Sequence, residues 1–373
     1  MHEAASPEIA RVRPGIYVLK PVTPRRRVVR LAFVGCGRVT TELHLPALRG
    51  NKDIDVVAFC DVDDARATAA ARIVPSARVV SDVAALVRDP AVDAVAVCTP
   101  PSEHATHASA VLEAGKHLFV EKPLALTRAD CDAIVARAET SDAVAAVGFN
   151  LRQHRLLRAA HDIVARGTLG RIDLVRSLFT TDIRLTRELP GWRNDRAVGG
   201  GVLFELATHH FDLWRWLLSS EVVEVSALSR SEGSDDTSAS VTAKLSSGAL
   251  ATAQMAERTT PVNQIDILGD RARMRVSLYD FDGLDVAPLT RAPGSLAARA
   301  QLVLRTLRAL PAGVRGALSG GDYVRTYAWQ WRRFADAILR DQPSAATLDD
   351  GRATVRIAIA AADSVKEGRP ILI

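Results

Sequence analysis

The chain has 373 residues, of which 48% are hydrophobic and 24% charged, a composition typical of a folded globular protein and not of a disordered one. Its formal net charge is +5, with 48 basic and 43 acidic residues interleaved along the chain, which argues against a surface built for nucleic acid. The four cysteines form no CxxC pair and no run approaches the roughly 20 apolar residues of a membrane span, so we expect a cytoplasmic protein without membrane or metal partners.

The first half of the chain alternates between two kinds of segment. Residues 1–27 form an N-terminal extension, and short apolar runs rich in β-branched residues then begin at positions 28, 54, 92, 116 and 143. Between them lie stretches rich in Ala and Leu, at 65–72, 83–88, 105–114 and 129–138. Strands that are apolar throughout are typical of a parallel sheet covered on both faces. The sequence therefore predicts a doubly wound Rossmann domain over residues 28–149.

A glycine turn follows the first of these runs, in the segment LAFVGCGRVTTELHLPAL. Gly35 permits a tight turn, Gly37 lets the backbone approach a pyrophosphate, and the helix that follows presents its N–H groups. Asp61 closes the second run, where a carboxylate can accept hydrogen bonds from an adenosine ribose. Two more aspartates at 63 and 64 would repel a 2′-phosphate, so we predict NAD, although Arg66 leaves NADP open.

Charged residues follow the fourth run directly, in the segment FVEKPLALT at 119–127. Glu121 and Lys122 are either solvated charges at the end of a strand or functional groups at the edge of a sheet. A second segment, GGGVLFELATHH, leads glycines into a predicted helix on which Glu205 and His209 are four residues apart. Residues at this spacing share a helix face, and a carboxylate beside an imidazole can orient it. His210 points away and is interpreted as a packing residue.

After Asn150 the pattern changes. One helical stretch at 156–167 leads into segments with period-two alternation at 171–185, 222–231, 238–247 and 248–259, which predict antiparallel strands. The predicted fold class is α/β, with an N-terminal Rossmann sheet and a C-terminal α+β domain built on an open, mostly antiparallel sheet. The second domain spans 150–345, with a basic helical insertion at 291–320. Residues 346–373 form a helix and tail that return to the domains.

Four motifs occur in order along the chain: GCGRV with HLPAL, CTPPSEHATHASAVLEAGKHLFVEKPLA, GFNLR and GGGVLFELATHHFDL. Together they resemble the Gfo/Idh/MocA family of oxidoreductases, which includes inositol and sugar dehydrogenases. The resemblance runs from about residue 30 to 373 and leaves out the N-terminal extension and the insertion at 291–320.

The resemblance implies hydride transfer between a nicotinamide and a secondary alcohol or ketone of a sugar, nucleotide sugar or cyclitol. Lys122, followed in the family by a cis bond to proline, and His209 are the implied proton-handling residues, with Glu205 in place of the family's usual Asp. The implied cofactor contacts are Gly35, Gly37, Arg38, Val39, Asp61, Thr99, Pro100, His104, Glu121, Lys122, Trp192 and Arg193. The implied substrate contacts are Lys122, Asn150, Arg152, Arg193, Asp195, Glu205 and His209.

Two other functions stay open from the sequence. One is the branch of the same family that keeps NAD bound and cleaves glycosidic bonds through transient oxidation. The other is a non-catalytic sensor that binds NAD, although such a protein needs neither Lys122 nor His209. The open sheet of the second domain predicts self-association as a homodimer or homotetramer. The direction of the reaction is not fixed by the sequence.

Overall fold

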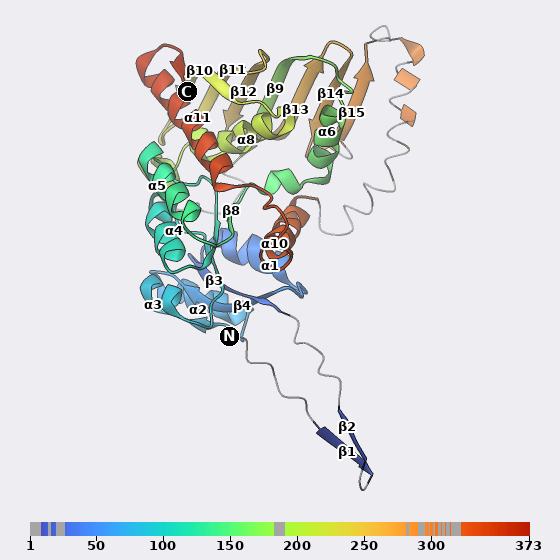
Figure 1. Cartoon of the computed structure of the whole chain (residues 1–373). Helices are drawn as coiled ribbons and strands as arrows, with labels where there is room; N and C mark the ends of the chain where they lie inside the picture. Colours follow the sequence, from blue (N-terminus) through green and yellow to red (C-terminus); the bar gives the residue numbers. More distant parts are fainter. Residues whose placement is uncertain are drawn as a thin grey trace.

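The computed structural model describes residues 9–13, 16–19, 27–182, 191–280, 283–289 and 322–373, with a few positions between 295 and 314. These residues form two large sheets, one in each half of the molecule (Figure 1). A separate pair of antiparallel strands, β1 (Ile9–Arg13) and β2 (Ile16–Leu19), lies within the N-terminal extension. Most of the predicted insertion at 291–320 lies outside the described residues. In the part of the chain described, no helix is both long and apolar enough to cross a membrane.

The first sheet has six parallel strands in the order β5-β4-β3-β6-β7-β8. Its strands are β3 (Val29–Val34), β4 (Ile54–Cys60), β5 (Arg78–Val79), β6 (Ala94–Val97), β7 (His117–Val120) and β8 (Ala145–Val147). Its helices include α2 (Asp64–Ile73), α3 (Val83–Arg88), α4 (His104–Glu113) and α5 (Arg128–Glu139). All four residues of β6 are buried, as expected for a central strand covered on both faces. The predicted Rossmann domain is confirmed.

The second sheet has eight strands in the order β15-β14-β13-β9-β12-β11-β10-β16, and β9 with β12 is its one parallel pair among the described strands. Its strands are β9 (Ile172–Asp182), β10 (Val222–Arg230), β11 (Ser238–Leu245), β12 (Leu250–Ala256), β13 (Arg258–Gly269), β14 (Ala272–Ser277), β15 (Gly283–Pro288) and β16 (Ile371–Leu372). Helices α6 (Arg155–Ala165) and α8 (Ala207–Leu218) lie across one face (Figure 1). Alternate residues of β11 are buried, so one face of this sheet is covered. The predicted mostly antiparallel sheet of the second domain is confirmed.

Two long helices near the C-terminus connect the halves. Helix α10 (Asp322–Arg340) buries Trp331 and Phe334 against Phe33 and Phe119 of the first domain. Helix α11 (Leu348–Glu367) contacts α5 of the first domain as well as β10 and α8 of the second. Aromatic rings dominate the first contact, since the centroids of Phe119 and Trp331 are 4.5 Å apart. The two helices therefore fix the halves relative to each other.

Candidate active site

The two glycines of the turn after β3 have different surroundings: Gly35 packs against the backbone, and Gly37 faces open space. Gly35 has φ +91, and a Cβ atom there would lie 2.6 Å from the carbonyl of Cys98, so only glycine fits. The Thr40 hydroxyl is buried and donates to the Gly35 carbonyl at 2.7 Å. A Cβ atom at Gly37 would meet nothing within 4 Å. The first turn of the π-helix η1 (Val39–His44) follows at once with no side-chain cap, which suits a pyrophosphate.

Asp61 stands at the end of β4 beside this turn. Its carboxylate accepts hydrogen bonds from the backbone N–H groups of Cys36 at 2.7 Å and Asp63 at 2.9 Å. A carboxylate offers about four acceptor positions, so Asp61 can hold the turn and still accept a ribose hydroxyl. Arg66, which left NADP open in the sequence, lies 3.2 Å from the Asp63 carboxylate in an exposed pair. The residues around this turn fit a dinucleotide.

Lys122 joins the two halves of the molecule. It follows β7, and its peptide bond to Pro123 is cis. The Lys122 ammonium donates to the backbone carbonyl of Glu205 at 2.8 Å and lies 3.4 Å from the Glu205 carboxylate. Arg193 lies 3.2 Å from the same carboxylate. A strand end of the Rossmann sheet therefore meets α7 (Val202–Glu205) of the second domain through an ion pair.

Glu205 is an anion between two cations. Burial alone would raise the pKa of its carboxyl, but the neighbouring Lys122 and Arg193 cations lower that pKa to about 2. Both side chains of the Lys122 pair are largely buried, with 11% and 18% of their surfaces exposed. The charges of this pair are therefore poorly screened by solvent.

His209 lies on α8, one helical segment after Glu205. The predicted continuous helix is interrupted, because α7 ends at Glu205 and α8 begins at Ala207. Burial lowers the pKa of His209 well below its usual value, and the Lys122 ammonium lowers it further, while the Glu205 carboxylate opposes this. The Nδ1 atom of His209 is buried with no hydrogen-bond partner among the described residues. His209 is therefore a neutral imidazole at neutral pH.

Two predicted cofactor contacts bind other groups of the protein. His104 is buried, with Nδ1 2.7 Å from the Pro123 carbonyl and Nε2 2.9 Å from the Thr99 carbonyl. Both ring nitrogens face backbone carbonyls, and because burial lowers the pKa of the ring, the neutral imidazole donates to one of the two. His104 connects the segment at Thr99 and Pro100 to the segment at Pro123, and its contact with a cofactor stays a prediction. Arg38 pairs with Glu42 at 3.0 Å on the surface beside Val39.

Glu121 is held by a histidine that the sequence reasoning left unassigned. Its Oε1 atom lies 3.0 Å from Nε2 of the fully buried His44, and its Oε2 atom accepts from the Lys122 backbone N–H at 3.2 Å. The Trp331 indole donates to Nδ1 of His44 at 3.2 Å. Because an indole N–H can only donate, Nδ1 of His44 is the acceptor of this bond, and the Nε2 atom faces Glu121. The HLPAL motif was the available signal for His44.

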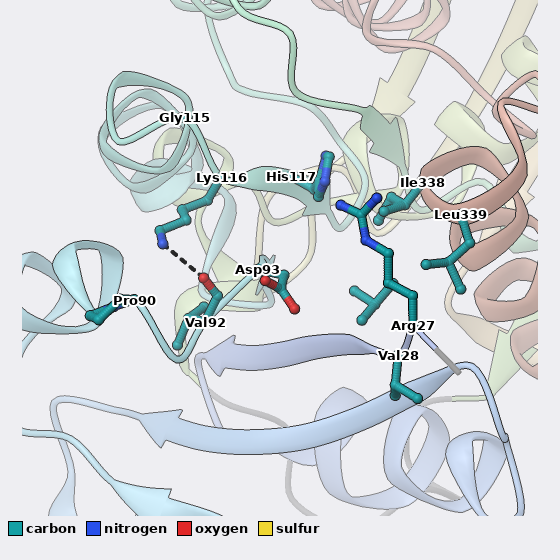
Figure 2. A pocket seen from close by; sticks show the side chains of 11 residues that line it. Arg27, Val28, Pro90, Val92, Asp93, Gly115, Lys116, His117, Ile338 and Leu339 are labelled. Atoms are coloured by element: carbon teal, nitrogen blue, oxygen red, sulfur yellow. Dashed lines mark hydrogen bonds between the residues drawn. The ribbon is translucent and has the colours of Figure 1, made fainter. Parts of the chain in front are cut away.

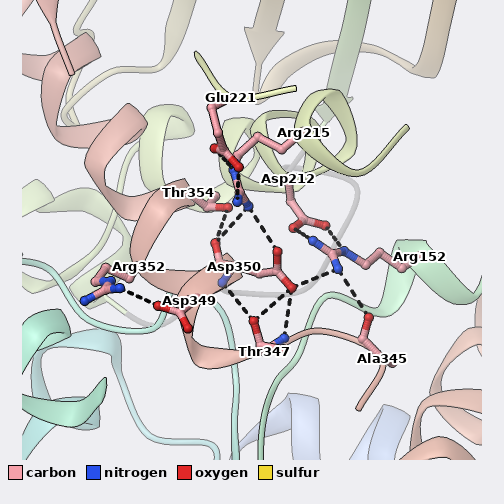
Figure 3. A network of polar contacts seen from close by, with 10 residues as sticks. All are labelled: Arg152, Asp212, Arg215, Glu221, Ala345, Thr347, Asp349, Asp350, Arg352 and Thr354. Carbon is pink, nitrogen blue, oxygen red and sulfur yellow. Dashed lines mark hydrogen bonds and ion pairs between the residues drawn. The ribbon is translucent and has the colours of Figure 1, made fainter. Parts of the chain in front are cut away.

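Three predicted substrate contacts already have protein partners. The Asn150 amide donates to Thr326 at 2.9 Å. The Arg152 guanidinium binds Asp212 and Asp350 in a network drawn in Figure 3, so we withdraw it as a substrate contact. Asp195 is exposed and caps the short helix η6 (Arg196–Val198) through the Ala197 N–H at 2.8 Å.

The loop before η6 contributes aromatic and charged groups. The guanidinium carbon of Arg193 lies 6.0 Å from the centre of the Trp192 ring. Glu257, which the sequence reasoning missed, is buried, and burial raises the pKa of its carboxyl while the Arg193 cation opposes this. Tyr327 of α10 was also missed, and burial raises the pKa of its hydroxyl, as do the nearby charges of Glu121 and Glu205. These groups came from segments that showed no motif.

Two cavities lie elsewhere, since neither is lined by Lys122 or His209. One, of about 180 Å³, lies at the amino ends of the parallel strands, where Lys116 donates to the Val92 carbonyl at 2.8 Å (Figure 2). The other, of about 340 Å³, lies on the second sheet and includes Leu174, Leu250 and Leu268. The first cavity has its lysine already bound to the backbone and carries no further assignment.

The first domain is a Rossmann domain, and the ends of its strands meet a helix of the second domain that carries a histidine. This arrangement is typical of two-domain oxidoreductases that bind a dinucleotide. Residues 29–149 match the profile of an oxidoreductase family described as having an NAD-binding Rossmann fold. Residues 157–275 match the profile of the GFO/IDH/MocA C-terminal domain. The chain belongs to the Gfo/Idh/MocA family, and the resemblance seen in its motifs is confirmed.

Named relatives show what this chain is similar to. It is 33% identical over 205 residues to 1,5-anhydro-D-fructose reductase of Ensifer adhaerens, covering 55% of this chain and 61% of that protein. It is 31% identical over 199 residues to myo-inositol 2-dehydrogenase of Thermotoga maritima, covering 53% of this chain and 58% of the relative. The match thus covers less than two thirds of these relatives. The WlbA dehydrogenase of Bordetella pertussis, solved with NADH and UDP-GlcNAcA, shares the fold with a TM-score of 0.80 at 21% identity, over 93% of this chain and 98% of that one.

Proposed function

We propose that the protein is an NAD-dependent dehydrogenase or ketoreductase acting on a CH–OH group of a sugar, nucleotide sugar or cyclitol. One observation carries the proposal. At the carboxyl edge of a Rossmann sheet, the Lys122 ammonium contacts Glu205 across the domain boundary, and His209, whose buried Nδ1 atom has no hydrogen-bond partner among the described residues, lies on the helix that follows Glu205. A cation and a neutral base at this edge are the two groups that alcohol oxidation requires of a protein. The names of the curated relatives support a sugar or cyclitol substrate.

The two groups divide the proton chemistry between them. A nicotinamide, when bound, supplies the hydride acceptor or donor. His209, neutral at physiological pH, takes the proton from the substrate hydroxyl, and in the reverse direction its protonated form returns the proton to a carbonyl oxygen. Lys122 donates a hydrogen bond to the same oxygen and stabilises the negative charge that develops there. Glu205 balances the charges of Lys122 and Arg193 and supports the protonated state of His209.

The preference for NAD over NADP is part of the proposal. Asp61 places a carboxylate where an adenosine ribose would bind, and Asp63 adds a second negative charge. Arg66 pairs with Asp63, so its positive charge is already balanced by a carboxylate. A 2′-phosphate would meet net negative charge here.

A screen of sugars, inositols and keto-sugars with NAD and NADP tests the proposal through absorbance of the reduced cofactor. Net formation or consumption of NADH is expected, whereas turnover without it would indicate glycosidic cleavage through transient oxidation. With a verified substrate, Lys122→Ala should lower kcat by roughly 100-fold or more while NAD still binds. Wild-type turnover by that variant would reject the role of Lys122.

The exposed face of the second sheet supports self-association. Leu174 on β9 lies beside Leu250 on one neighbouring strand and Leu268 on the other, which makes an apolar row across three strands. All three side chains are exposed, and such a row is typical of a protein interface. We propose a homodimer or homotetramer that buries this face.

A further inference from the structure

An ion-pair network lies where the chain passes between the two domains. Arg152 sits in the short helix η3 (Asn150–Gln153), just after the last strand of the Rossmann sheet. Its guanidinium binds Asp212 through two bonds of 2.8 and 2.6 Å. A third bond, of 3.0 Å, reaches Asp350 in the first turn of α11, and a fourth reaches the Ala345 carbonyl at 3.3 Å. Figure 3 shows the Arg152 guanidinium between the two carboxylates.

A second arginine completes the network from the same helix as His209. Arg215 donates to the Asp350 carboxylate at 3.2 Å and binds Glu221 at the surface. Asp212 and Arg215 follow His209 by three and six residues on α8, so they lie roughly one and two turns beyond it along that helix. The side chains of Arg152, Asp212 and Arg215 are at most 10% exposed. Buried charges of this kind must remain paired, so their geometry is closely constrained.

The first turn of α11 also contacts the segment that carries Lys122. A Cβ atom at Gly351 would lie 2.9 Å from side-chain atoms of both Leu124 and Val147, so the helix backbone packs directly on these two side chains. The Val147 N–H donates to the Ala346 carbonyl at 3.2 Å. Leu124 is only two residues from Lys122 in the chain. One helix turn thus contacts the lysine segment through Gly351 and the histidine helix through Asp350.

We propose that Asp350 and Arg152 are positioning residues that set the distance between Lys122 and His209. This inference rests on the proposed function, because it assigns the two residues a task in that reaction. The network joins η3, α8 and α11, and it acts in addition to the direct contact of Lys122 with Glu205. A displacement of about 1 Å between reacting groups can cost about 100-fold in rate. Loss of the network should therefore lower kcat more than it weakens NAD binding.

The test compares two neighbouring substitutions. Asp350→Asn removes the charge but keeps an oxygen that can accept from the Thr347 N–H, which caps α11. Asp349→Asn is the matched control, since Asp349 lies in the same turn, is 64% exposed and pairs only with Arg352 among the described residues. Asp350→Asn should lower kcat about tenfold or more, with an unchanged Kd for NAD, and Asp349→Asn should change neither. Wild-type kcat in Asp350→Asn overturns the inference, as does a loss of NAD binding in proportion to kcat.

Hydrogen exchange provides a readout that does not depend on turnover. Backbone amides of residues 120–124 and 207–212 should exchange about tenfold faster in Asp350→Asn than in Asp349→Asn. If no alcohol or ketone is turned over by the wild type, the proposed function fails, and the exchange rates alone decide whether the network positions these segments. If Asp350→Asn does not fold, Arg152→Lys replaces it, because lysine keeps the charge but cannot bind two carboxylates as a fork. Unchanged exchange at both segments in the folded variant overturns the inference.

Discussion

Glu205→Gln tests the electrostatics of the site. The carboxyl of Glu205 has a pKa of about 2 in the folded protein against 4.5 for an ordinary glutamate. A difference of this size corresponds to about 3 kcal/mol of stabilisation. Because the folded pKa is depressed, this contribution is fully present above about pH 4.5 and is lost as pH falls toward 2.

Urea unfolding measured at several pH values gives the readout. The variant should be less stable than the wild type by about 3 kcal/mol near pH 7, and the difference should shrink steadily below pH 4.5. Glu113→Gln is the control, since Glu113 forms an exposed pair with Arg137, and its effect should stay below about 1 kcal/mol. A difference between Glu205→Gln and wild type that does not vary with pH would refute the assigned pKa shift.

The remaining predictions concern the base, the cofactor and the assembly. His209→Asn should lower kcat by roughly 100-fold or more with little change in NAD affinity, measured by stopped assays and fluorescence titration; equal activity would reject its acid/base role. Asp61→Asn keeps an acceptor for the Cys36 N–H but removes a charge, so the ratio of kcat/KM for NADP to that for NAD should rise about tenfold. Leu250→Lys places a charge in the apolar row of the second sheet and should reduce the molar mass measured by light scattering. Leu250 is exposed, so the substitution leaves Leu48 and the other core residues unchanged.

The elements of the fold follow from patterns that act locally. Apolar runs predicted the buried strands of the first sheet, and period-two alternation predicted β9 to β12. The strand β5 was not predicted, because it has only two residues, both exposed, and therefore shows no apolar pattern. The packing of α10 on the Rossmann sheet could not be predicted, since an amphipathic helix does not specify which of two apolar surfaces it will cover.

The site shows the same limit. The motifs identified Lys122, Glu205 and Arg193, which the structure brings into contact. They also suggested Arg152 as a substrate contact, but its partner Asp350 is 198 residues away in the chain. The spacing of residues within a motif cannot reveal that a carboxylate far away in the chain binds the guanidinium. Local patterns therefore predicted the chemical groups better than the partners that hold them.

The position of α10 has a consequence for any attempt to divide the protein. Residues 28–149 read as a complete nucleotide-binding unit, yet Phe33 and Phe119 are covered by Trp331 and Phe334, which belong to a helix nearly two hundred residues further on. A fragment cut after residue 149 would expose these rings to water and would tend to aggregate. A fragment that contains the Rossmann sheet must therefore include α10 as well, however well the first half is delimited by its sequence.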